Sequence, residues 1–167
     1  FGVIMLALVD GIPRVMNLKI MLQHFLNFRR EVIVKRTHFE LNEAEDRAHI
    51  LEGLKIAQEN IDEVIKLIKS SADPEAAKKG LIQKYSLSDN QAKAILDMRL
   101  QRLTSLEVDK IVNELGELLV TIKALKEILE SHDIQSKIIR EEFAEVGERY
   151  KDNRRSEIIP ISGDLSI

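Results

Sequence analysis

The sequence predicts a mainly α-helical protein: a long antiparallel coiled-coil hairpin with a small helical globular tip and a short N-terminal β-hairpin. Of its 167 residues, 44% are hydrophobic and 32% charged, whereas 4% are aromatic and only seven are glycine and three proline. This composition is typical of long helices rather than β-sandwiches. The second observation is a run of aliphatic residues over 108–129 that recur at alternating three- and four-residue steps.

The N-terminal segment predicts two strands joined by a turn. Apolar residues lead to Asp10-Gly11, a pair typical of hairpin turns, and a second strand is expected over Ile12–Met16. A lone two-stranded hairpin is marginally stable in water. The chain also begins at Phe1 rather than methionine. We therefore expect an excised piece of a larger protein, with the neighbours of the hairpin upstream.

A very long helix is expected next. Asn17 can cap its N-terminus, and between Leu18 and Ile68 the sequence has no proline and a single glycine, Gly53. About fifty helical residues would reach about 75 Å, which requires a partner along the length.

The regular aliphatic run supplies that partner as a returning helix. Val112 and Leu119 widen its apolar stripe, which predicts more than one neighbour along part of its length. An antiparallel hairpin is the simplest arrangement. The seam comprises Val108, Ile111, Leu115, Leu118, Ile122, Leu125 and Leu129.

A compact insert is expected between the two long helices. Asp73 followed by Pro74 is typical of a helix start, and we expect Gly80 to interrupt this short helix. The predicted boundaries are a β-hairpin over 1–17, an outgoing helix over 18–72, a globular tip over 73–104, returning helices over 105–151, and a linker over 152–167 toward a further domain.

The stretch QAKAILDMRLQRLTSLE, residues 91–107, is apolar almost all round its expected helix. Ser88 with Gln91, and Thr104 with Glu107, form capping boxes that open this helix and the next. One apolar face can pack on the preceding helix. The other needs either a second copy of the chain or a local three-helix core, and periodicity leaves both open.

Composition also limits chemistry. The chain has no cysteine, which excludes disulfides, a thiol nucleophile and cysteine-ligated zinc. No phosphate-binding loop or hydrolase motif occurs, so we expect no catalytic, cofactor or metal site. No signal peptide or membrane-spanning run is present, and we expect a cytoplasmic protein. Glu45, His49 and Glu52 share a helical face, but solvated charge pairing is favoured over metal binding.

Charge is uneven along the first long helix. Residues 14–36 hold six basic residues and one acidic, a balance of +5, whereas residues 40–63 hold eight acidic and two basic, a balance of −6. The basic group could contact DNA phosphates, or form a solvated face paired with Glu31 and Glu40. Its members are Arg29, Arg30, Lys35 and Arg36. The acidic part of the helix would repel a nucleic acid.

Four segments together resemble one family. They are GIPRVMNLKIMLQHFLNFRREVIVKRTHFEL, DRAHILEGLKIA, QAKAILDMRLQRLTSLE and IIREEFAEVGERYKDNRRSEI. They look like the A subunits of the bacterial type IIA topoisomerases, DNA gyrase and topoisomerase IV, with the overall likeness nearer gyrase. The resemblance implies the last strands of the tower domain, then a coiled-coil stalk bearing the dimer contact of the exit gate, or C-gate.

The resemblance further implies that the second face of the tip helix meets the same helix of another subunit. The expected interface residues are Gln91, Ala94, Ile95, Met98, Arg99, Arg102 and Leu103. In the family the catalytic tyrosine follows an arginine upstream of this region, and Tyr85 and Tyr150 do not match that context. Magnesium and ATP are used by other domains and the B subunit of an A2B2 enzyme, so the expected partners are a second copy, gyrase B and double-stranded DNA, without a membrane. The alternative of another class is a structural coiled-coil adaptor with no role on DNA.

Overall fold

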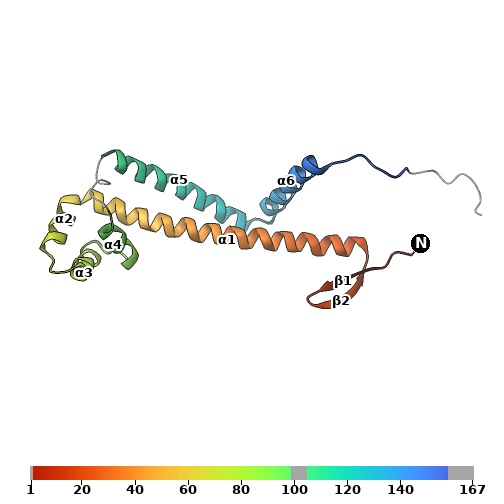
Figure 1. The fold of residues 1–167 in the computed structure, drawn as a ribbon, viewed down its shortest axis with the longest axis horizontal. Coiled ribbons are helices and arrows are strands. Elements are labelled where there is room, and N and C mark those ends of the chain that lie inside the picture. The colour runs from red at the N-terminus through yellow and green to blue at the C-terminus, as the bar shows by residue number, and fades with distance from the viewer. Residues whose placement is uncertain (1, 99–104, 158–167) are drawn as a thin grey trace, which may run out of the picture.

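The computed structural model, which describes residues 2–98 and 105–157, is an elongated molecule organised along one long helix (Figure 1). Helix α5 runs back along this helix, α2, α3 and α4 gather at one end, and the hairpin and α6 lie toward the other. The predicted fold class is thereby confirmed. The elements are β1 (Met5–Val9), β2 (Ile12–Met16), α1 (Leu18–Glu59), α2 (Ile61–Ser70), α3 (Pro74–Tyr85), α4 (Asp89–Leu96), α5 (Ser105–Glu130) and α6 (His132–Tyr150).

The N-terminal hairpin is a two-stranded antiparallel sheet in which Val9 pairs with Ile12. Asp10 and Gly11 have φ values of 52° and 76°, the double positive φ of a type I′ turn. Met16 is buried, whereas both strands carry exposed aliphatic side chains. The turn and the second strand therefore form as predicted.

Helix α1 begins where the sequence predicts and ends earlier. Asn17 accepts a hydrogen bond from the backbone N–H of Ile20 at 2.9 Å, as expected of an N-cap. The expectation of one uninterrupted helix to residue 72 is wrong, because α1 stops at Glu59 and α2 starts at Ile61. Asn60 donates from its side-chain amide to the carbonyl of Ile56 at 2.9 Å. Such local side-chain bonds compete with the helical ladder and favour a break.

The seam between α1 and α5 holds the shaft together. On α5, four of the predicted seam positions are buried and two more, Leu118 and Leu129, are partly buried against the same cluster. The buried residues of α1 that face them also recur at three- and four-residue steps. Val112 and Leu119 are instead 44% and 49% exposed, so the described part of the chain supplies no second neighbour for them. The buried seam residues are Leu41, Ala44, Ala48 and Leu51 on α1 with Ile111, Leu115, Ile122 and Leu125 on α5.

The tip, formed by α2, α3 and α4, shares one hydrophobic core with the seam between α1 and α5. Leu81 of α3 is fully buried and belongs to one hydrophobic cluster with Val64 of α2 and Ala92 of α4. The prediction that Gly80 interrupts α3 is wrong, because the helix runs unbroken to Tyr85. A Cβ at Gly80 would lie 3.1 Å from Cδ2 of Leu67, so the missing side chain lets α2 pack closely.

Candidate interaction surfaces at the two ends of the stalk

Helix α4 at the tip is short and seated firmly on its own chain. Asp73 and Ser88 cap α3 and α4, and Ser88 and Gln91 form the complete predicted capping box. Helix α4 ends at Leu96, with Asp97 as its C-cap, whereas the sequence predicted a longer helix. The second capping box, of Thr104 and Glu107, lies outside the residues whose side chains the structure describes.

Gln91 joins α4 to the long helix. Its amide nitrogen donates to the carbonyl oxygen of His49 at 2.7 Å, and only 6% of the residue is exposed. The contact requires Gly53, because a Cβ there would lie 2.7 Å from both Cβ and Cγ of Gln91. His49 also reaches α4, with Nε2 2.7 Å from the hydroxyl oxygen of Ser88. The bare backbone at Gly53 therefore sets how closely the tip docks on α1.

These contacts divide the predicted dimer residues into three groups. Gln91 and Ile95 are 6% and 3% exposed, so they pack inside this chain rather than on a surface that a second copy could touch. The physical reason is the docking of α4 against α1 and α3, which supplies the local core that the sequence left open. Ala94 and Met98 are partly exposed at the edge of that core. The third group, Arg99, Arg102 and Leu103, lies outside the described residues.

The residues weighed as metal ligands are engaged separately. Glu45 pairs with Lys126 of α5 at 2.7 Å, while His49 turns to Ser88. Among the described residues, no three histidine, cysteine, aspartate or glutamate side chains are grouped as a metal would require. Glu45 therefore helps to register α1 against α5.

The end of α1 nearest the N-terminal hairpin is called here the base of the stalk. There, α6 places the carboxylate of Glu142 beside the basic cluster of α1. Arg29 and Arg36 donate to the two oxygens of Glu142, at 2.5 and 2.9 Å. Partial burial would raise the pKa of Glu142, but the hydrogen bonds and charges of Arg36 and Arg29 outweigh it, and the pKa is lowered. We call these three residues the Glu142 clasp.

The remaining members of the basic cluster also have partners within the chain. Arg30 donates to the hydroxyl of Ser136 at 3.3 Å, and Lys35 pairs with Glu31 at 2.7 Å. Arg36 additionally lies 3.9 Å from Glu40. The predicted pairing with Glu31 and Glu40 is therefore present, and the long-range partners on α6 add to it.

Sequence reasoning missed Glu142, which lies 113 residues from Arg29. The available signal was the seven-residue spacing of Arg29 and Arg36, which places both on one helical face. Aromatic packing supports the same docking: the rings of Phe25 and Phe143 lie 5.8 Å apart, and the Arg29 guanidinium lies 6.0 Å from the Phe143 ring.

Comparison with known proteins decides the family. The family described as the DNA gyrase/topoisomerase IV A subunit matches residues 1–144 of the sequence. The chain belongs to this family. In the part of the chain that the structure describes, no helix is both long and apolar enough to span a bilayer.

Individual members of the family are about half identical to the chain. The DNA gyrase A subunit of Clostridium acetobutylicum is 51% identical over all 167 residues. Its counterpart in Halalkalibacterium halodurans is 54% identical over 158 residues, and that of Helicobacter pylori 50% over 158 residues. The chain spans about a fifth of the length of these proteins, 20% in the first case and 19% in the others.

Proposed function

We propose that the chain is the dimerisation and exit-gate segment of a DNA gyrase A subunit, in the ATP-dependent enzyme that breaks, passes and rejoins double-stranded DNA to introduce negative supercoils. The observation that carries the proposal is the separation of the two ends of the stalk (Figure 1). Helix α1 has 42 residues and is therefore about 63 Å long, with the tip at one end and the basic base at the other. Membership of the family supports assignment to a gyrase or topoisomerase IV A subunit. The names of the cited relatives favour gyrase over topoisomerase IV.

Two copies would meet through the tips. Ala94 and Met98 offer partly exposed apolar surface beside the tip core, and Arg99, Arg102 and Leu103 follow directly in the sequence. A contact of about 1,000 Å² or less is typical of interfaces that open and close. A gate must release once per cycle, so a small apolar contact rimmed by arginines suits it better than an obligate interface.

The stalk itself would serve as the wall of a passage. The acidic balance over residues 40–63 disfavours lasting contact with a duplex. At the base, the Glu142 clasp occupies Arg29 and Arg36. Lys35 is the most accessible of the four basic residues proposed for phosphate contacts, with 74% of its side chain exposed.

Strand cleavage and ATP hydrolysis would be performed elsewhere in the enzyme. The hydroxyl of Tyr85 donates to Glu63 at 3.3 Å, and Tyr150 is solvent-exposed on the last turn of α6. Neither has the sequence context of the family nucleophile. Magnesium and ATP would be handled by other domains and the B subunit, in a cytoplasmic A2B2 complex acting on double-stranded DNA.

The test is a crosslinked gate in a chimeric enzyme. The matching segment of the C. acetobutylicum gyrase is replaced by this chain in a host protein freed of accessible cysteines, and Met98→Cys is introduced. Since the chain has no cysteine, any crosslink within it is the engineered one. After oxidation with the B subunit present, the enzyme should still cleave DNA but lose multiple-turnover supercoiling, and a reductant should restore it.

The matched control is Lys123→Cys, an exposed position on the shaft in α5. It should give no crosslink between the two copies and should leave supercoiling unchanged on oxidation. Full supercoiling by a verified Met98 crosslinked dimer would refute the exit-gate function of this tip.

A further inference from the structure

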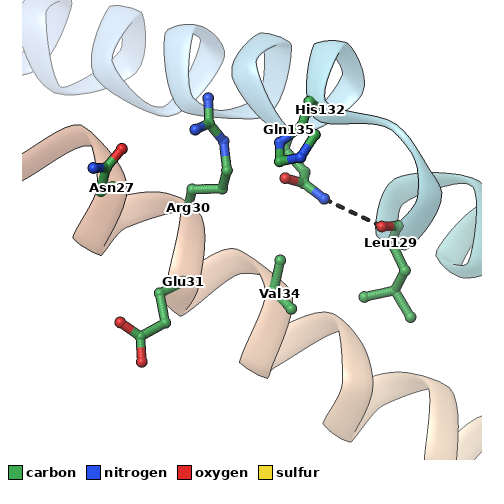
Figure 2. A pocket seen from close by; sticks show the side chains of 7 residues that line it. All are labelled: Asn27, Arg30, Glu31, Val34, Leu129, His132 and Gln135. Carbon is green, nitrogen blue, oxygen red and sulfur yellow. Dashed lines mark hydrogen bonds between the residues drawn. The ribbon is translucent and has the colours of Figure 1, made fainter. Parts of the chain in front are cut away.

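Two of the three buried polar side chains among the described residues are glutamines, and each joins two helices. Gln135, at the start of α6, is 2% exposed, and its amide nitrogen donates to the carbonyl oxygens of Ile128 and Leu129 at 2.9 and 3.4 Å (Figure 2). It therefore ties α6 to the end of the helix just before it. Gln91 instead bonds a residue 42 positions away in the chain, so it holds together elements that are distant in the sequence.

Both ends of the Gln91 amide are engaged, each with a different helix. Its oxygen Oε1 accepts from the backbone N–H of Ser88 at 2.9 Å, at the N-terminus of α4, and its nitrogen Nε2 donates to the carbonyl oxygen of His49 on α1 at 2.7 Å. A backbone N–H only donates and a carbonyl only accepts, so the two contacts agree on the orientation of the amide. Gln91 therefore completes the capping box and ties α4 to α1 at the same time.

The side chain of His49 adds a second tie between the same two helices. Its Nδ1 lies 3.4 Å from the amide nitrogen of Gln91, which can only donate, so in the neutral ring Nδ1 accepts and Nε2 carries the proton. Nε2 then donates to the hydroxyl oxygen of Ser88 at 2.7 Å, and this oxygen also accepts from the backbone N–H of Gln91 at 3.2 Å. Three residues thus form a closed hydrogen-bond network between α1 and the first turn of α4.

Glutamine has the length and the polarity that this pair of bonds requires. The site is tight, since a Cβ at Gly53 would lie 2.7 Å from both Cβ and Cγ of Gln91. A glutamate of the same length could accept from the N–H of Ser88 but has no hydrogen to donate to the carbonyl of His49 at neutral pH. A methionine offers only a weak acceptor and no donor. Substitution can therefore separate capping of α4 from its attachment to α1.

The orientation of α4 also fixes the exposed edge of the tip. Ala94 and Met98 follow Gln91 by three and seven residues and are partly exposed. The backbone N–H of Met98 donates to the carbonyl of Ile95 at 3.3 Å, so the position of Met98 follows that of the helix. Rotation of α4 on α1 would move this edge as a whole.

We propose that Gln91 is a positioning residue of the exit gate: it sets the angle of α4 on α1 and thereby the place at which Ala94 and Met98 meet a second copy. The inference rests on the function proposed for the tip. In a dimer with two-fold symmetry the same surface is used twice, so an error in the angle of α4 displaces both halves of the contact. Gln91 acts on the contact from inside its own chain.

The first measurement is the orientation of α4 within one chain. Nitroxide labels are placed at Glu43→Cys on α1 and Lys93→Cys on α4, both exposed, in the chimeric enzyme assembled with an excess of unlabelled A subunits. Pulsed electron paramagnetic resonance should give a narrow distance distribution for the parent and a broadened or shifted one for Gln91→Glu and Gln91→Met. Exchange of the Ser88 amide should stay slow in the glutamate variant and become faster in the methionine variant, because only the carboxylate still accepts from it.

The second measurement is the contact between the two copies. In the chimeric enzyme that carries Met98→Cys, both Gln91 variants should slow crosslinking about three- to tenfold, a factor typical of one lost hydrogen bond. Gln135→Glu is the matched control, because it also removes bonds from a buried glutamine to carbonyl oxygens, but at the joint of α5 and α6. It should leave the distances and the crosslinking at the parent values. Circular dichroism checks the helices, and Gln91→Met decides the matter if Gln91→Glu loses them.

Three results would each overturn the proposal. A parent-like distance distribution in both Gln91 variants would show that packing alone orients α4. Altered distances with crosslinking at the parent rate would show that the angle of α4 does not matter to the contact, and equal slowing by Gln135→Glu would show a general loss of stability. Failure of the proposed gate function has a separate signature, because the Met98-crosslinked parent would then continue to supercoil with Gln91 intact.

Discussion

The tip and the base of the stalk dock their helices by different physical means. At the tip, α4 meets α1 through buried apolar groups and the contact of Gln91 with Gly53, where no space remains for a methyl group. At the base, α6 meets α1 through the partly exposed Glu142 clasp and the Phe25–Phe143 ring contact. The tip should therefore respond to changes in side-chain volume, and the base to changes in charge, pH and salt.

The largest effect is expected from emptying the tip core. Leu81→Ala removes a fully buried side chain, which should lower the free energy of unfolding by about 2–5 kcal/mol. Leu119→Ala, at a half-exposed position of the shaft, is the matched control and should change it by about 0.5 kcal/mol or less. Urea denaturation followed by circular dichroism measures both, and equal losses would contradict a packed tip core around Leu81.

A second pair of variants tests the close approach at Gly53. Gly53→Ala adds a Cβ that would lie 2.7 Å from Gln91, and the overpacking should destabilise the chain by about 1–3 kcal/mol. Gly116→Ala adds the same atom where nothing lies within 4 Å, so it should stabilise the helix by about 0.5–1 kcal/mol. The two changes in unfolding free energy should have opposite signs, and the same sign for both would refute the tight docking.

The capping box of α4 should contribute less. Ser88→Ala removes the acceptor for the N–H of Gln91 and should cost about 1 kcal/mol. Ser88→Asp retains a capping oxygen and is expected to stay close to the parent chain. Hydrogen exchange of the first-turn amides of α4 provides the local readout: faster exchange in the alanine variant alone supports the cap, and equal rates in all three chains contradict it.

The smallest effect, and the one that depends on pH, belongs to the base. Glu142→Gln removes the charge of the clasp and should cost up to about 1 kcal/mol at pH 7, since the pair is partly exposed. The pKa of Glu142 is lowered in the folded chain. Its contribution is therefore present above the pKa of an unfolded glutamate, about 4.3, and is lost as pH falls through the lower folded value.

The difference in stability between the parent chain and Glu142→Gln should accordingly shrink in acid. Denaturation at pH 7 and pH 3 measures it, and 1 M salt should reduce it at pH 7 by screening. Glu141→Gln is the control: Glu141 lies on the same helix but, among the described residues, pairs with Lys137 one turn away, so the change should show little of either effect. A difference that persists at pH 3 would show that the side chain acts through packing rather than charge.

Features set by neighbouring residues were predictable from the sequence. The caps at Asn17, Asp73 and Ser88 involve groups three residues apart, and the α5 stripe follows from helical geometry alone. The break at Asn60 was missed because the sequence there has neither proline nor glycine. The local signal was a single asparagine, whose amide bonds the Ile56 carbonyl and so competes with the helical hydrogen bonds.

Contacts between residues far apart in the sequence could not be predicted from the spacing of apolar and charged residues. Burial of Gln91 depends on His49 and Gly53, about forty residues away, and a polar residue on an amphipathic helix gives no sign of it. The isolated glycine in the first helix was the one hint, because it permits close approach of another element. The Glu142 clasp required knowing how α6 folds back on α1, which local spacing does not specify.

The paired seam of α1 and α5 also makes the reach of the stalk a matter of whole repeats. Seven residues added to both helices would keep every buried position facing its partner and would carry the tip about 10 Å farther from the base. An insertion of two residues in one helix would instead rotate the apolar stripe into water. The distance between the tip and the base can therefore change only in discrete steps, each of which lengthens both helices by the same whole number of repeats.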